Sequence, residues 1–336
     1  MYTDEDLNLA VEQGIFSENA VIEFRDSMAA QKYSPIVDEE NIRLVASFND
    51  IFVVIACCLL LFSSLFVLKP INETLGYVSF IAISWGLAEF FVLRKKMALP
   101  AIVLMATFVG GVFALFMPSI EHSVPLNPES LKLVLASGAA AIAAYAHWRR
   151  FHVPITIAAG TLAALALVLS ALMFTFPILN HVLFLLLFVS GVISFTLAMY
   201  WDASDTSRTT SRSDVAFWLH LASAPLIIHP VFSMFGVLGG NESVLIMSLV
   251  VVLYLLMTMI SLIIDRRAFM VSSLIYVVYA LTAIFNNFGS IGYGFALTGI
   301  VMGSALLLLS AFWHTARKSL THRLPESLKA YVPMVG

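Results

Sequence analysis

The sequence contains little charge and almost no cysteine. Only 12% of its 336 residues are Asp, Glu, Lys or Arg, whereas ordinary soluble domains contain about 25%. The two cysteines, Cys57 and Cys58, are neighbours within an apolar run. On a helix their side chains point about 100° apart, which speaks against a disulfide or a metal site. We interpret both as small apolar residues.

Several motifs that carry chemistry are missing. The sequence has no Gly-x-x-x-x-Gly-Lys-Ser/Thr, no His-Glu-x-x-His, no Gly-x-Ser-x-Gly and no Cys-x-x-Cys. These absences disfavour a nucleotide triphosphatase, a zinc protease, a common serine hydrolase and a thiol oxidoreductase. The sequence also has no basic block of the kind that binds nucleic acid. It identifies no metal, no cofactor and no enzyme class, although an intramembrane enzyme with an unfamiliar site stays open.

Long apolar runs dominate what is present. Hydrophobic residues make up 60% of the chain, against about 45–50% in soluble proteins. Runs of about twenty apolar residues match the ~30 Å hydrocarbon core of a bilayer, where the backbone must be helical. We therefore predict an all-α polytopic transmembrane bundle. The ten expected spans are 51–68, 74–93, 98–118, 131–148, 153–176, 179–200, 215–236, 243–264, 268–286 and 291–313.

The basic residues predict how the bundle is oriented. If the chain starts in the cytoplasm, only Lys69 and Lys132 of its 18 Lys and Arg residues fall in outer loops. Positive charge is normally retained on the cytoplasmic side. We therefore expect an even number of spans, with both the N and the C terminus in the cytoplasm.

The chain divides into three expected parts. Residues 1–47 predict a small cytoplasmic helical module, 48–314 the transmembrane bundle, and 315–336 a cytoplasmic tail. In the module, Gly14 stands where a first helix would end and Ser17 where a second would begin. Short helices bury little core by themselves, so we expect this module to dock on the bundle or on a soluble protein partner.

The seventh span carries the most unusual set of residues, which is His220, Pro225, His229 and Pro230. Each proline removes a helix hydrogen bond, and interrupted helices line the solute path in several transporters. A histidine there could carry a proton. The alternative is a kinked structural helix. A shared metal or haem site is disfavoured because the two histidines lie on opposite faces and about 13 Å apart along the helix.

Three acidic residues lie near basic turns. Glu89 could be a proton or cation site, but we favour an ion pair with Arg149 or Arg150, since a charge at this depth can reach the interface. Asp214 is expected to cap the seventh span. Asp265 is expected to pair locally with the two arginines that follow it.

Small residues predict where helices approach closely. Gly110 is flanked by alanines at four-residue spacing, and Gly299 and Gly303 form a Gly-x-x-x-Gly motif. Small side chains let helix backbones come together in lipid. We expect these glycines to pack helices, either within one chain or, for Gly299 and Gly303, between two copies. The sequence does not set the oligomeric state.

Several stretches share features with a known group of proteins. They are 48–53, 213–220, 229–230, 264–269, 324–325 and 332–333, together with the N-terminal helical hairpin. With these stretches the chain resembles uncharacterised polytopic inner-membrane proteins of bacteria. The resemblance spans most of the chain and implies a location in the bacterial inner membrane. It transfers no functional residues.

These observations favour a secondary transporter or permease for a small solute, coupled to protons and with the seventh span lining its path. The size of the bundle and the absence of catalytic motifs support this hypothesis. The alternative is a membrane scaffold that recruits a partner through residues 1–47, because many ion-coupled carriers bury more charge. An enzyme ranks third.

Overall fold

The structure of the protein is a computed structural model. The residues that it describes form helices and turns but no strand. The chain divides into two units, 1–41 with 336, and 42–335, and each is considered by itself. The described residues are 10–11, 13–17, 19–21, 23, 48–117, 128–206, 208, 210–237, 243–288, 292–325 and 332.

The described residues of the first unit include one turn between two helical segments. Gly14 has φ +69°, a conformation that favours glycine, and the Ile15 N–H donates to the Ala10 carbonyl over 2.9 Å. The Ser17 hydroxyl accepts from the Ala20 N–H over 3.2 Å. The expected helix end and helix start are therefore both found. Most of the predicted module at 1–47 lies outside the described residues.

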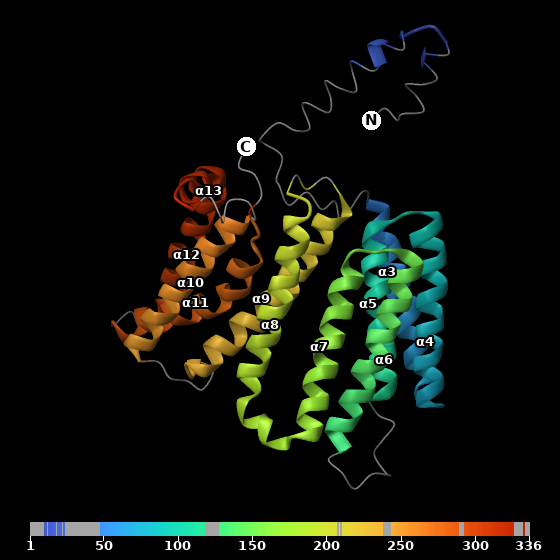
Figure 1. The fold of residues 1–336 in the computed structure, drawn as a ribbon, viewed down its shortest axis with the longest axis horizontal. Coiled ribbons are helices and arrows are strands. Elements are labelled where there is room, and N and C mark those ends of the chain that lie inside the picture. Colours follow the sequence, from blue (N-terminus) through green and yellow to red (C-terminus); the bar gives the residue numbers. More distant parts are fainter. Residues whose placement is uncertain are drawn as a thin grey trace. The chain divides into compact units, whose positions relative to one another are not determined.

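Ten helices in the described part of the chain are long and apolar enough to cross a membrane, as expected for a multi-pass membrane protein. All ten overlap the expected spans (Figure 1). The helices are α3 (Phe48–Leu68), α4 (Glu73–Ala88), α5 (Ala98–Phe116), α6 (Pro128–Phe151), α7 (Ile155–Thr175), α8 (Leu183–Ala203), α9 (Ser211–Met234), α10 (Val244–Ile264), α11 (Ala268–Asn287), α12 (Gly294–Ala311) and the short α13 (Trp313–His322).

Two short segments depart from regular α-helix. The second span continues from α4 into the π-helix η1 (Glu89–Arg94), and the 3-10 helix η2 (Pro177–Val182) precedes α8. The tenth expected span stops two residues early, at Ala311, and Trp313 begins the separate helix α13.

The helices of the second unit pack in two groups. In the first group, helices α3 to α7 each contact the next helix in the chain. In the second group, α11 is central and contacts α9, α10 and α12. Helix α8 packs on α9, and α13 packs on α10. The groups meet where α7 contacts α9 and, to a smaller extent, α8. This seam is a buried cluster made of Ala158 in α7, Ala198 in α8, and Val215 and Leu219 in α9.

Helix α9 runs without interruption through both of its prolines, so the expectation of a twice-broken helix was wrong. More than half of its most apolar 18-residue stretch is buried, a larger share than in any other span. A Cβ atom at Gly191 of α8 would lie 2.8 Å from the Leu226 carbonyl carbon. Because Pro230 cannot donate to that carbonyl, packing by α8 supports the helix where it lacks a hydrogen bond.

The glycines that pack helices closely are not the ones expected. A Cβ atom at Gly110, Gly299 or Gly303 would meet no atom of the described chain within 4 Å, so these glycines do not pack helices within it. Close approaches occur instead at Gly111 and Gly191, where a Cβ atom would lie within 2.9 Å of a neighbour. Small residues make a helix face flat, but they do not specify whether another helix lies against it.

Candidate functional site

The turns after α4, α6, α8 and α10 lie at one end of the bundle (Figure 1). We call this the basic end, because these turns or the helix ends beside them carry Arg94, Arg149, Arg150, Arg208 and Arg266. Ionisable side chains from four elements meet there in the second group of helices. These elements are the last turn of α8, the first half of α9, the turn between α10 and α11, and α13.

Asp202, His220 and Arg266 form a buried triad. The Asp202 side chain is 1% exposed, His220 0% and Arg266 3%. Arg266 donates through Nη2 to Asp202 Oδ1 over 2.6 Å and through Nε to Oδ2 over 3.3 Å. The distance between His220 Nε2 and Asp202 Oδ2 is 2.9 Å. One carboxylate of α8 therefore holds both a helix and a turn that are distant in the sequence.

The triad determines the tautomer of His220. An ionised carboxylate can only accept hydrogen bonds, so the imidazole must carry its proton on Nε2 and donate it to Asp202. His220 Nδ1 is buried and has no hydrogen-bond partner among the described residues. A second proton on that nitrogen would have no acceptor among these residues.

Asp265 is the centre of a second cluster beside the triad. Arg208 Nη1 donates to its Oδ2 over 2.8 Å, and the Trp313 indole N–H donates to its Oδ1, also over 2.8 Å. Arg317 Nε lies 3.7 Å from Oδ1. Since Arg266 follows Asp265 directly, the α10–α11 turn connects the triad to α13 and to the loop after α8.

Local backbone geometry places these side chains. Asp265 ends α10 in the left-handed conformation with φ +55°, which Asp tolerates better than most residues. The Asp205 carboxylate accepts from the backbone N–H of Thr210 over 2.9 Å and from its hydroxyl over 2.7 Å, so it shapes the loop before α9. Burial is the main cause that lowers the pKa of Arg208 in this loop.

The expected cap at Asp214 was wrong, and Asp265 has a partner that was not expected. The N-cap of α9 is Thr210, whose side chain accepts from the Arg212 N–H, and Asp214 lies within the first turn. Asp265 pairs with Arg208, 57 positions away, while Arg266 pairs with Asp202. These pairs join distant parts of the chain because the helix ends meet at the basic end.

The two histidines of α9 lie in different environments. His229 is exposed, and its Nδ1 lies 2.6 Å from the hydroxyl oxygen of Tyr276 in α11. Pro225 is also exposed, whereas Pro230 is buried. The structure therefore does not bring His220 and His229 together. The expected solute path along α9 stays a prediction, with Pro225 and His229 as its exposed members.

Glu89 forms the expected ion pair. Arg150 donates through Nε to Glu89 Oε1 over 2.8 Å and through Nη2 to Oε2 over 2.7 Å. Both side chains are partly exposed, at 35% for Glu89 and 54% for Arg150. The favoured interpretation, a pair with the basic turn after α6, is confirmed with Arg150 as the partner.

Three buried or ion-paired residues, Asp202, Arg208 and His147, were not predicted from the sequence. Asp202 is an acidic residue at the end of an apolar run, and such a position is a signal for a functional or ion-paired group. His147 of α6 is fully buried, and its Nδ1 lies 3.1 Å from the Thr156 hydroxyl oxygen. Its Nε2 has no hydrogen-bond partner among the described residues.

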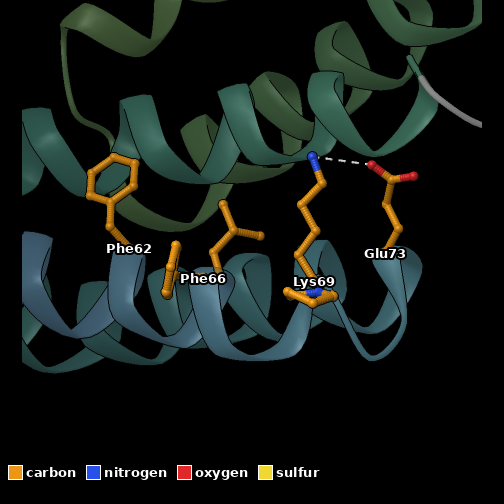
Figure 2. A pocket seen from close by; sticks show the side chains of 6 residues that line it. Phe62, Phe66, Lys69 and Glu73 are labelled. Carbon is orange, nitrogen blue, oxygen red and sulfur yellow. Dashed lines mark ion pairs between the residues drawn. The ribbon is translucent and has the colours of Figure 1, made fainter.

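A hollow of about 610 Å³ lies at the opposite end of the bundle, beside the turn between α3 and α4. Figure 2 shows Phe62 and Phe66 of α3 on one side and the Lys69–Glu73 ion pair on the other. Lys69 also donates to the Tyr77 hydroxyl over 3.1 Å. Hydrogen bonds to Tyr77 and Glu73 raise the pKa of Lys69. Most of the lining of the hollow is apolar, which suits a hydrocarbon group better than a polar solute.

The chemistry open to the triad is proton exchange. Asp202 and His220 can each bind and release a proton, and Arg266 is a fixed cation that favours the ionised carboxylate. Among the described residues, no three His, Cys, Asp or Glu side chains are placed to hold a metal ion.

The comparisons with known proteins add no family to this description. No protein-family model, no curated protein and no solved structure matches the chain. Its function is therefore inferred from the contacts, burial and charges of the triad and of the helices that hold it.

Proposed function

We propose that the chain is a proton-coupled secondary transporter for a small solute in the bacterial inner membrane. In this proposal Asp202 and His220 exchange the proton and Arg266 responds to it. The observation that carries the proposal is the burial of all three ionisable side chains, with Asp202 in direct contact with both His220 and Arg266.

The cost of burying charge is the first argument. Ionisable groups within a membrane are expensive, and their presence favours a functional role. A contact that only holds helices together does not require charge, because apolar side chains of similar volume often give the folded protein equal or greater stability than a buried ion pair. Asp202 and Arg266 are buried as an ion pair nonetheless. The free-energy cost of burying this ion pair is explained if protonation of Asp202 can break the contact during function. It is not explained if the contact is permanent.

The position of the triad is the second argument. His220 directly follows Leu219, which belongs to the seam cluster, and Asp202 directly follows Trp201, which packs against that cluster. A proton on Asp202 would remove the negative charge that holds Arg266. The α10–α11 turn would then be released from α8, next to the contact between the two groups of helices. Proton binding at the triad can thus change the packing at the seam.

A transporter must open this seam during its cycle, which gives a test that needs no knowledge of the solute. Leu219→Cys, made in a chain with Cys57→Ala and Cys58→Ala, places a single thiol in the seam. We expect a membrane-impermeant maleimide to label it from the side of the basic end. Maleimide reacts with the thiolate, whose fraction falls with pH, so each rate is divided by that of a freely exposed thiol at the same pH. This relative rate should rise at a pH low enough to protonate Asp202. Labelling is measured by mass spectrometry on the protein in lipid nanodiscs.

Met247→Cys is the matched control. Met247 is also fully buried, but it lies in the core of the second group, away from the seam. A transporter labels at position 219 and not at 247. Equal, slow labelling at both positions over the whole pH range would argue against the proposal.

A membrane scaffold is the second candidate. It is supported by the burial of α9 and by the full burial of His220, which leaves no water-sized space beside the imidazole. In this proposal the charge clusters hold the ends of the helices in place, and residues 1–47 recruit a soluble partner. Deletion of 1–47 should then remove a specific protein from affinity purifications of the chain. An unchanged set of co-purified proteins would contradict the scaffold function.

A further inference from the structure

Helix α13 has two faces of different character. Trp313, Arg317 and Thr321, four positions apart, are buried, and the first two contact Asp265. The exposed residues include His314, Lys318 and His322, and Arg323 follows the helix as its C-cap. Helix α13 contains no acidic residue. The surface that it turns away from the bundle therefore carries only basic ionisable groups.

The orientation of α13 places this surface at the level of the membrane interface. Only Phe312 separates it from α12. Figure 1 shows α13 end-on, whereas α10, α11 and α12 are seen from the side. Since these three helices cross the bilayer, α13 runs along its surface. Phe312 and Leu308 are exposed apolar residues at the junction, as expected where the hydrocarbon region ends.

We propose that α13 is a binding surface for anionic phospholipid headgroups, with Lys318, His322 and Arg323 as the contacting side chains. A cation held near an anionic leaflet gains about 1 kcal/mol, and the attraction falls off within a Debye length of ~10 Å. A helix that begins one residue after a span lies within this distance. The half-buried Leu320 and Leu324 offer apolar contact to the lipid beside the headgroups.

This lipid site does not depend on the transport function. It has a structural consequence in either case, because Trp313 and Arg317 on the opposite face contact Asp265, whose carboxylate also binds Arg208. Lipid bound to the exposed face would hold α13 against this cluster. The composition of the leaflet would thereby affect the order of the α10–α11 turn.

Amide hydrogen exchange of 313–323 tests the proposal on the full chain. The protein is placed in nanodiscs of phosphatidylcholine alone or of phosphatidylcholine with phosphatidylglycerol. We expect exchange in α13 to be about thirtyfold slower with the anionic lipid, the combined effect of two cations at the leaflet. We expect Lys318→Glu with Arg323→Glu to lose this difference and to match the wild-type protein in phosphatidylcholine, because both side chains are exposed.

Lys95→Glu with Lys96→Glu is the matched control, since it reverses two exposed charges on another turn of the basic end. It should keep the lipid-dependent slowing in α13. The proposal is overturned if the wild-type protein exchanges equally in both lipids, or if the variant at 318 and 323 keeps the difference. It is also overturned if the control loses the difference, because general attraction of the protein to the membrane would then explain it.

Discussion

Arg266 and Asp202 lie 64 positions apart in the chain, yet Arg266 Nη2 donates to Asp202 Oδ1 over 2.6 Å. This contact joins the end of α8 to the turn between α10 and α11. His220 contacts the same carboxylate from α9. Three segments that are separate in the sequence are thus held by one acidic side chain, which makes Asp202 the most informative residue to change.

Asp202→Asn should destabilise the protein by about 3–5 kcal/mol, because it leaves the buried Arg266 guanidinium without a counter-charge. The free energy of unfolding is measured by titration with sodium dodecyl sulfate in mixed micelles. Glu89→Gln is the control, since its partner Arg150 is more than half exposed; we expect a loss below about 1 kcal/mol. Equal losses in the two variants would contradict the structure of the triad.

Replacing the whole triad should restore stability. A variant with Asp202→Leu, His220→Leu and Arg266→Met leaves no unpaired charge, and buried ion pairs exchanged for apolar residues of similar volume are often neutral or stabilising. We expect it to be at least as stable as Asp202→Asn in the same titration. If the triad is a proton switch, the variant should also lose the pH dependence of labelling at position 219. Stable protein with unchanged pH-dependent labelling would exclude the triad from the switch.

Gly191→Ala should separate α8 from α9. The new Cβ atom would lie 2.7 Å from Ile227 Cγ1 and 2.8 Å from the Leu226 carbonyl carbon, and overpacking of this kind costs about 1–3 kcal/mol. Gly299→Ala is the control, because a Cβ atom there meets nothing within 4 Å and alanine favours a helix over glycine by up to ~1 kcal/mol. Thermal unfolding in detergent should show opposite shifts. A destabilised Gly299→Ala would point instead to a neighbour at α12, such as a second copy of the chain.

Lys69 should stabilise the turn between α3 and α4 only while it is protonated. Its hydrogen bonds to Tyr77 and Glu73 raise its pKa in the folded protein. A group whose pKa rises on folding contributes stability below its unfolded pKa and loses it as the pH rises through the folded value. The difference in stability between wild type and Lys69→Gln should therefore be constant at neutral pH and shrink above about pH 10. A difference that grows with pH would show that the contact is not charge-dependent.

The spans were predictable because the bilayer acts on each one separately. Length and apolar composition decide whether a segment can cross, and all ten expected spans were found as helices. The ion pair of Glu89 with Arg150 was also predictable, since an acidic residue one turn from the end of a span can reach a neighbouring basic turn. Each of these inferences needed only the residues near one end of a helix.

The triad and the glycine contacts were not predictable in the same way. Asp202 and Asp265 each had basic residues nearby in the sequence, but their partners depend on which helix ends lie side by side. Gly191 packs on α9, while Gly299 and Gly303 meet no neighbour in the described chain. Pro225 and Pro230 suggested a broken helix, but packing by α8 and α11 supports a continuous one.

The sequence by itself determined that the chain is helical, that ten segments can cross a membrane and that basic residues gather in alternate turns, because lipid constrains every segment independently of the others. Only the tertiary structure decided that Asp202, His220 and Arg266 share one buried site, and that α13 turns Trp313 towards Asp265 and Lys318 away from it. Such contacts depend on the relative positions of whole helices, which many weak packing interactions set together.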